Sequence, residues 1–149
     1  MDNTRGTVLG VWQLGLYRRA AGYAFAGLPG VGAATTWLKL LTHSDLSHLA
    51  LAGEATAIAI GAGLFGWWGL LRVRLELTTD GIVTVNPWGT QRLPWSSVSA
   101  VSLNGSGAQF HTPDGFKYIS SALSDLGGLE PQEDRFAEVL AIVRTQLHK

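Results

Sequence analysis

The sequence predicts an α+β membrane protein: a two-helix transmembrane hairpin followed by a small β-rich domain that ends in an α-helix. Three observations lead to this prediction. No Asp, Glu, Lys or Arg occurs from Ala20 to Leu38, and none occurs from Ala55 to Leu71. From Val73 onward, apolar and polar residues alternate, which is typical of half-buried strands. Near the C-terminus, apolar residues return at the spacing of an amphipathic helix.

The first predicted membrane helix covers residues 20–41 and the second covers residues 49–71. About twenty residues at 1.5 Å per residue cross the roughly 30 Å hydrocarbon core of a bilayer. Pro29 is compatible with such a helix, because neighbouring groups or water can satisfy the carbonyl that proline leaves free. Glu54 lies near the start of the second helix, so we expect it close to the outer interface, where a charge costs less than at the bilayer centre.

Basic residues flank the helix pair mainly on one side. Two arginines precede the first helix and two follow the second, whereas the connecting loop from Lys39 to His48 carries Lys39 alone. By the positive-inside rule, both termini lie in the cytoplasm, which predicts a multi-pass protein of the plasma membrane. Tryptophans near helix ends settle at headgroup level. The predicted membrane-interface residues are therefore Arg18, Arg19, Trp37, Trp67, Trp68, Arg72 and Arg74.

Small residues recur at four-residue spacing in both helices, a pattern that lets two helix backbones approach closely. The predicted helix-packing residues are Gly22, Ala26, Gly30, Ala59 and Gly63. The same faces offer a route to a homo-oligomer. Two alternatives stay open: accidental spacing in Gly/Ala-rich helices, and a signal peptide that begins at Arg18-Arg19.

The predicted segments are an N-terminal cytoplasmic or interfacial tail (1–19), the hairpin (20–72) and the β-rich domain (73–149). Turn signals at 79–81, 87–89, 104–107 and 113–115 separate the expected strands. A polar, Gly-rich loop then runs from Ser120 to Gln132. The predicted core of the domain includes Trp95 and the apolar face of the C-terminal helix, with Phe136, Leu140 and Val143.

Three segments of the domain, Leu75–Asn86, Arg92–Val98 and Thr112–Gly115, carry a family resemblance. Over roughly residues 64–147 the chain resembles bacterial PH domain-containing membrane proteins of actinobacteria, of the low-molecular-weight protein antigen type. The Arg-x-Pro-Trp-Ser element that begins at Arg92 is the most specific part of the match. The resemblance implies two membrane helices, then a PH-like, seven-stranded, partly open β-barrel capped at one end by the C-terminal α-helix.

The sequence does not predict an enzyme, a cofactor or a metal site. The pattern Gly61-x-Gly63-x-x-Gly66 lies within an expected membrane helix, where helix packing explains it better than dinucleotide binding. His43, Asp45 and His48 could share a metal, but a short polar loop explains all three. His111 has no evident acid or nucleophile partner in the sequence. The absence of cysteine excludes thiolate ligands and thiol nucleophiles.

The charge pattern predicts a binding module. A net charge of zero provides no overall field for nucleic acid. From Glu76 to Asp134 only Arg92 and Lys117 are basic, too few for a phosphoinositide pocket. We expect a membrane-anchored interaction or scaffolding module that binds a protein partner at the cytoplasmic face. The alternative is a lipid-sensing or membrane-organising protein, for which Trp88, in a Pro-Trp-Gly turn, could reach the headgroups.

Overall fold

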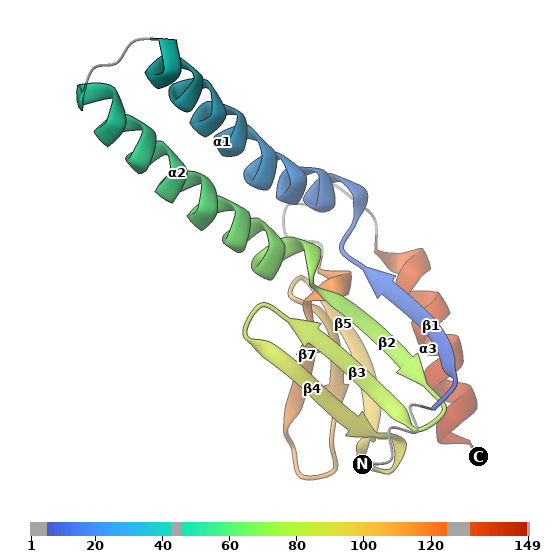
Figure 1. Cartoon of the computed structure of the whole chain (residues 1–149). Coiled ribbons are helices and arrows are strands. Elements are labelled where there is room, and N and C mark those ends of the chain that lie inside the picture. Colours follow the sequence, from blue (N-terminus) through green and yellow to red (C-terminus); the bar gives the residue numbers. More distant parts are fainter. Residues whose placement is uncertain (1–5, 43–45, 125–131, 149) are drawn as a thin grey trace. The chain divides into compact units, whose positions relative to one another are not determined.

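A computed structural model describes residues 6–42, 46–124 and 132–148 of the chain (Figure 1). The chain divides into two compact units. The helical unit is Leu16–Leu71, and the β unit combines Met1–Gly15 with Arg72–Lys149. The β unit is therefore built from residues on both sides of the helical unit in the sequence.

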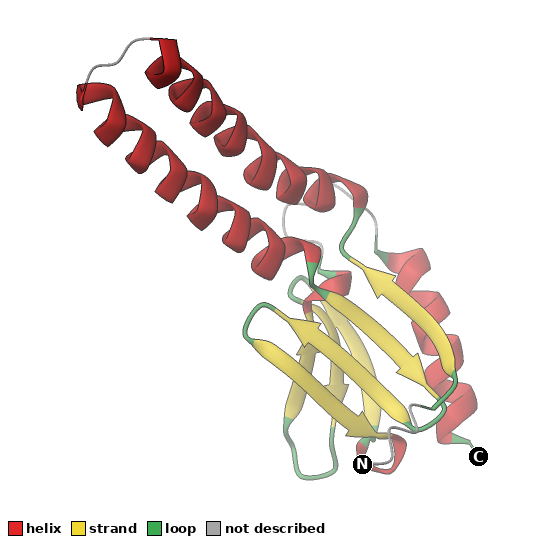
Figure 2. Ribbon diagram, in the orientation of Figure 1, coloured by secondary structure: helices red, strands yellow, loops and turns green. Residues whose placement is uncertain are grey.

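The β unit contains two antiparallel sheets and a helix (Figure 2). The first sheet has the order β1 (Val8–Gln13), β2 (Arg74–Thr78), β3 (Gly81–Asn86) and β4 (Gly89–Pro94). The second has the order β5 (Ala100–Asn104), β6 (Gly107–His111) and β7 (Lys117–Ser120). Short 3-10 turns cover Trp95–Ser97 and Ser121–Leu123, and α3 covers Glu133–Leu147. Helices with two antiparallel sheets agree with the predicted α+β class and with a PH-like fold.

The strand β1 differs from the predicted N-terminal tail. It pairs with β2, so that Trp12 lies opposite Leu75 and Gln13 lies opposite Arg74. The indole Nε1 of Trp12 donates to Glu138 Oε2 at 3.1 Å, and the Arg135 guanidinium donates to the Gln13 carbonyl, so α3 holds β1 as well. Local periodicity could not reveal this strand, because its partner lies some sixty residues away in the sequence.

The core of the β unit follows from strand alternation, which turns every second side chain inward. Leu75, Leu77, Ile82 and Phe110 are at most 1% exposed. Burying each such side chain contributes about 1.5–3 kcal/mol. The helix α3 covers this core with Val139 and Val143.

Of the four residues predicted for the core, Val143 is buried, whereas Trp95, Phe136 and Leu140 are partly exposed. The Trp95 indole N–H donates to the Thr78 carbonyl at 2.9 Å, so its ring rests against the end of β2. Only one of the four is thus enclosed on all sides.

A buried asparagine links the two sheets. Asn86, at the end of β3, is 1% exposed. Its Nδ2 donates to the Ile119 carbonyl at 2.7 Å, and its Oδ1 accepts from the Ser121 backbone N–H at 3.0 Å. A buried amide is tolerated when its polar atoms are satisfied. Asn86 therefore fixes the end of β3 against the end of β7.

The helical unit contains α1 (Leu16–Thr42), α2 (Leu46–Gly66) and a π-helical turn (Trp67–Leu71). The two long helices lie side by side and run antiparallel (Figure 1). Both begin earlier than predicted, so Arg18 and Arg19 belong to the first turn of α1. Within the described residues, one segment is long and apolar enough to cross a membrane, the 24 residues His48–Leu71.

Candidate functional site

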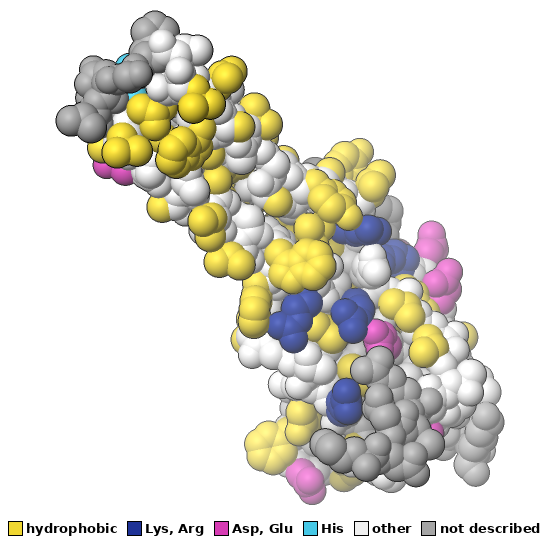
Figure 3. All heavy atoms as spheres, in the orientation of Figure 1, with side chains coloured by type: hydrophobic (Ala, Val, Ile, Leu, Met, Phe, Trp, Pro, Cys, Tyr) yellow, Lys and Arg dark blue, Asp and Glu magenta, His cyan; other side chains and the backbone are white. Residues whose placement is uncertain are grey.

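The helical unit exposes its large apolar side chains. Leu28, Val31, Ile58 and Leu64 are 60–72% exposed. The buried positions of α1 and α2 are small: Gly22, Ala33, Ala52 and Gly66. Figure 3 shows hydrophobic side chains along the visible surface of the helices. Exposure of this many large apolar side chains is characteristic of a partner or lipid interface rather than of a face in contact with water.

The predicted helix-packing residues differ in how closely they approach the other helix. A Cβ at Gly22 would lie 3.1 Å from Leu70 Cβ. A Cβ at Gly66, which the four-residue pattern did not include, would lie only 2.8 Å from the Gly22 carbonyl oxygen. At Gly30 and Gly63 a Cβ would meet nothing within 4 Å. The close backbone approach is therefore concentrated at one end of the pair. Ala26 and Ala59 are half-buried.

The register of α1 and α2 is defined at both ends. The Trp37 indole N–H donates to Thr56 Oγ1 at 2.9 Å. Lys39 lies two residues beyond Trp37, and Glu54 lies two residues before Thr56, so both charges are near the same end of the helix pair. At the other end, Gly22 packs against Leu70 and Leu71.

The predicted interface residues fall into both units. Trp67 and Trp68, in the π-helical turn, are 60% and 53% exposed, and Trp37 is 43% exposed. Arg72 and Arg74 belong to the β unit, where Arg74 begins β2. These two arginines therefore form part of a sheet surface as well as following the second helix.

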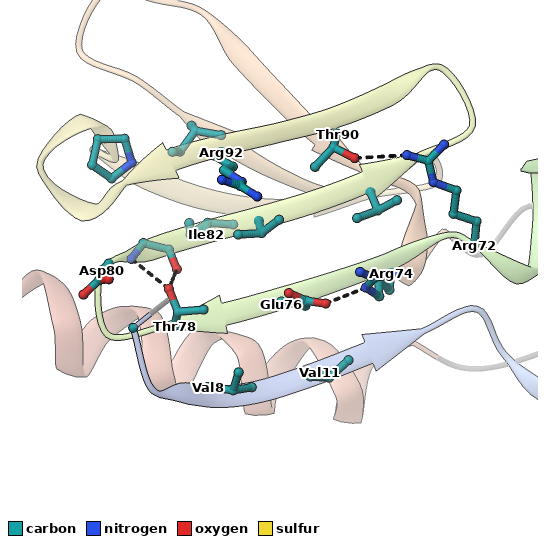
Figure 4. A pocket seen from close by; sticks show the side chains of 16 residues that line it. Val8, Val11, Arg72, Arg74, Glu76, Thr78, Asp80, Ile82, Thr90 and Arg92 are labelled. Carbon is teal, nitrogen blue, oxygen red and sulfur yellow. Dashed lines mark hydrogen bonds and ion pairs between the residues drawn. The ribbon is translucent and has the colours of Figure 1, made fainter. Parts of the chain in front are cut away.

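A hollow of about 660 Å³ lies on the outer face of the four-stranded sheet (Figure 4). The strand register brings Arg74, Val85 and Thr90 into one row across β2, β3 and β4. The next row contains Val11, Glu76, Val83 and Arg92, with Val11 contributed by β1. Valines thus form much of the floor, and three arginines, Arg72, Arg74 and Arg92, converge on it.

The three arginines differ in their partners. Arg74 Nε forms an ion pair with Glu76 Oε1 at 2.5 Å. Arg72 Nη2 donates to Thr90 Oγ1 at 3.4 Å, a long bond to a neutral hydroxyl. Arg92 is exposed and forms no hydrogen bond or ion pair with any described residue. Arg92 therefore presents to this face guanidinium donors that no described residue uses.

Counting basic residues along the chain missed this cluster. A two-residue turn at Pro87-Trp88 pairs Asn86 with Gly89, and that register places Arg92 opposite Val83. Arg92 therefore lies on the same face as Arg74, although eighteen positions separate them in the sequence. Cross-strand register was the signal that could have found the cluster.

His111 also has a partner that the sequence did not reveal. Its Nε2 lies 2.7 Å from the Ser102 Oγ, between β6 and β5. A serine–histidine pair resembles the beginning of a nucleophile and base arrangement. No carboxylate among the described residues is bonded to the ring. A cross-strand hydrogen bond accounts for the contact.

The described residues include no group of three His, Asp or Glu side chains that could hold a metal ion. His43 and Asp45, two members of the metal alternative, lie outside the described residues, as does most of the loop predicted from Ser120 to Gln132. Two aromatic side chains project from turns: Trp88 is 74% exposed and Phe116 is 68% exposed.

Comparison with curated proteins and with solved structures found no match. A family model described as Bacterial PH domain matches residues 72–139. The matched region begins at Arg72, so it contains β2 to β7 and the first half of α3 and omits β1. PH domains are generally interaction modules without catalytic activity. Residues 72–139 are thus similar to the Bacterial PH domain family, in agreement with the two-sheet fold.

Proposed function

We propose that this chain is a membrane-anchored PH-like interaction module that binds a protein partner at the cytoplasmic face of the plasma membrane. In this proposal α1 and α2 both span the bilayer, and both termini lie in the cytoplasm. The β unit is then held at the membrane by two covalent connections, one before α1 and one after α2. The resemblance to PH domains supports the interaction role.

The observation that carries the membrane part is the register of the helix pair. The uncharged stretches 20–38 and 55–71 are about 29 Å and 26 Å long at 1.5 Å per residue. Because Trp37 is level with Thr56 and Gly22 with Leu70, these stretches lie alongside each other. Their length matches a hydrocarbon core of roughly 30 Å. Charged residues then lie at both ends of the paired uncharged stretches.

A charge placed in the middle of these paired stretches tests the proposal. Leu64 is 60% exposed and lies near the centre of the second uncharged stretch. In water, Leu64→Lys would be harmless at so exposed a position, but in lipid it costs about 3 kcal/mol. We expect Leu64→Lys to lose membrane retention after alkaline carbonate extraction. Leu41→Lys is the matched control, because Leu41 is 80% exposed and lies beyond Lys39. Equal retention of both variants, or release of the unmodified chain by carbonate, would refute the anchor.

The interaction role requires a separate experiment. The full chain would be cross-linked in native membranes and purified beside a chain that ends at Leu71. Because residues 1–71 keep the anchor but not the β unit, partners specific to the β unit should appear with the full chain alone. Identical sets of proteins from both preparations would argue against the proposed module.

Lipid recognition is the second candidate function. The observation that favours it is the convergence of three arginines on the outer face of the four-stranded sheet. This was not expected from the sparse basic residues in the sequence.

A further inference from the structure

We infer that the free edge of β4 binds an extended acidic segment of a protein partner, which pairs with β4 as an additional strand of the first sheet. The inference rests on the proposed interaction module, and it adds to that function a site and the chemistry of the partner. The site consists of the backbone of Thr90 and Arg92 and of the Arg92 side chain.

The two sheets have four edge strands, which differ in what covers them. The strands β1 and β5 contact α3, and side chains of α3 form hydrogen bonds with β1. The edge of β7 is partly used, because the Ile119 carbonyl accepts from the Asn86 side chain. The strand β4 pairs with β3 alone, and no other described backbone group bonds to Thr90 or Arg92 (Figure 1). An unpaired edge of this kind is a template for a further strand.

The register identifies the backbone groups that β4 presents at this edge. A two-residue turn joins β3 to β4, so Asn86 and Gly89 exchange backbone hydrogen bonds at the base of the turn. The alternation of an antiparallel ladder then directs the N–H and C=O groups of Thr90 and Arg92 away from β3. Both residues are exposed. The edge therefore offers donors and acceptors at the spacing that an added strand requires.

The charge on this edge selects an acidic partner. Arg92 projects on the outer face of the sheet, where no described residue bonds to its guanidinium (Figure 4). A carboxylate opposite Arg92 on an added strand would accept two parallel hydrogen bonds from it. A second copy of β4 would instead bring two Arg92 side chains close together on one face, and like charges across strands are destabilising. The edge thus disfavours its own copy and favours a strand that carries Asp or Glu.

The neighbours of the edge suggest what should flank the acidic residue. An added strand directs alternate side chains to opposite faces of the sheet. One set would lie beside Thr90 and Arg92, and the other would lie on the face of Leu93, which is only 3% exposed. In the turn before β4, Trp88 is 74% exposed and provides an apolar ring for one end of the segment. We therefore expect an acidic residue with β-branched or aromatic neighbours.

Three substitutions separate the backbone of the edge from its charge. Thr90→Pro removes an N–H that β3 does not use, and proline is accepted at such edge positions. Thr90→Ala is the matched control, because it loses the same hydroxyl contact with Arg72 and keeps the N–H. Arg92→Gln keeps the backbone and removes the charge. Thermal unfolding in detergent would verify that each variant is folded.

The experiment uses the full chain in a neutral detergent. A phage-displayed library of random eight-residue peptides would be selected on the unmodified chain, and the enriched peptides would be measured by fluorescence anisotropy. We expect peptides with an acidic residue between β-branched residues. Their affinity should fall about tenfold with Thr90→Pro, up to about fivefold with Arg92→Gln, and little with Thr90→Ala. Hydrogen exchange should show that a bound peptide protects the amides of Thr90 and Arg92.

Several outcomes would overturn the inference. Equal affinity of Thr90→Pro and Thr90→Ala for the enriched peptides, or no enriched peptide at all, would exclude the edge as a site. Binding that is independent of Arg92 would refute the acidic partner. Self-association of the full chain that Thr90→Pro abolishes would assign the edge to a second copy.

Cross-linking in native membranes separates this result from the proposed function. If the chain with Thr90→Pro kept the partners that are specific to the β unit, the interaction module would stand and only the β4 site would be wrong. If the unmodified chain had no such partners, the proposed function itself would fail.

Discussion

The helical unit and the β unit handle apolar side chains in opposite ways. The β unit encloses Phe110, Leu75 and Leu77 completely, and exposes only a few large apolar side chains among its described residues, such as Trp88 and Phe116. The helical unit encloses glycine and alanine and directs Leu28, Ile58 and Phe65 outward. Within the helical unit, the Phe25 and Phe65 rings pack edge to face, with centroids 5.9 Å apart. Many other large apolar side chains of the unit are exposed, among them Val31, Ile60 and Leu64.

Under the proposed membrane anchor, this difference reflects one physical effect that operates in two solvents. In water, apolar area is removed by packing inside the fold, at about 25 cal/mol per Å². Between lipid tails no such removal is required, so helices associate through close backbone contact at small residues. The predictions below test where each rule holds, beginning with the largest expected effect.

Removal of β1 should destroy the β unit. Without residues 1–15 the domain loses the buried Trp12 and Leu14 and the strand that pairs with β2. Burial of two such side chains contributes about 5 kcal/mol, comparable with the whole stability of a small domain. We expect residues 72–149 alone to show no cooperative urea transition by circular dichroism.

The matched control restores the strand without the helices. Residues 1–15 joined to residues 72–149 by a short glycine-serine linker keep the pairing of Gln13 with Arg74. This joined domain should unfold cooperatively in the absence of detergent. Equal behaviour of the two chains would mean that β1 contributes little and that the β unit does not need residues before the helices.

The next largest effect should come from Asn86→Ala in the joined domain. The substitution removes the side-chain partner of the Ile119 carbonyl and of the Ser121 N–H, which are both partly buried. Each unsatisfied group costs about 1–3 kcal/mol, so we expect a loss of about 3 kcal/mol in urea unfolding. Asn104→Ala, at an exposed turn, serves as the control. A loss below 1 kcal/mol would show that the two sheets do not depend on this link.

In the helical unit, adding a single methyl group should lower the stability of the helix pair at one glycine and not at another. The Cβ of Gly66→Ala would lie 2.8 Å from a backbone oxygen of α1, so the helices must separate, at a cost of about 1–2 kcal/mol. Gly63→Ala adds the same methyl group in open space. Thermal unfolding in detergent should separate the two variants. If both lost equal stability, close approach at Gly22 and Gly66 would not hold the pair together.

The smallest expected effect is a gain in the stability of the joined domain. Thr84 is 0% exposed, and its Oγ1 has no hydrogen-bond partner among the described residues. Thr84→Val replaces the buried hydroxyl with a methyl group of similar size, so we expect about 1 kcal/mol of added stability in the joined domain. A loss of stability would reveal a partner for the hydroxyl, such as a buried water.

Much of the architecture was accessible from the sequence because it depends on local periodicity. The change from long uncharged stretches to two-residue alternation after Val73 predicted helices followed by strands, and the turns at 79–81 and 87–89 are where β2, β3 and β4 meet. The amphipathic pattern near the C-terminus likewise predicted α3. The α+β class was predicted on these grounds, whereas the resemblance to bacterial PH domains rested on the segments Leu75–Asn86, Arg92–Val98 and Thr112–Gly115 and agrees with the family match to residues 72–139.

Long-range pairing decided the rest. That Val8–Gln13 completes the first sheet, and that Arg72, Arg74 and Arg92 share one face, depends on register between segments far apart in the chain. Likewise, the four-residue spacing of small residues did not distinguish Gly66 from Gly63, because only the crossing of two helices determines which backbone atoms come close. Local propensity acts over a few residues, whereas these contacts form only when the whole chain has folded.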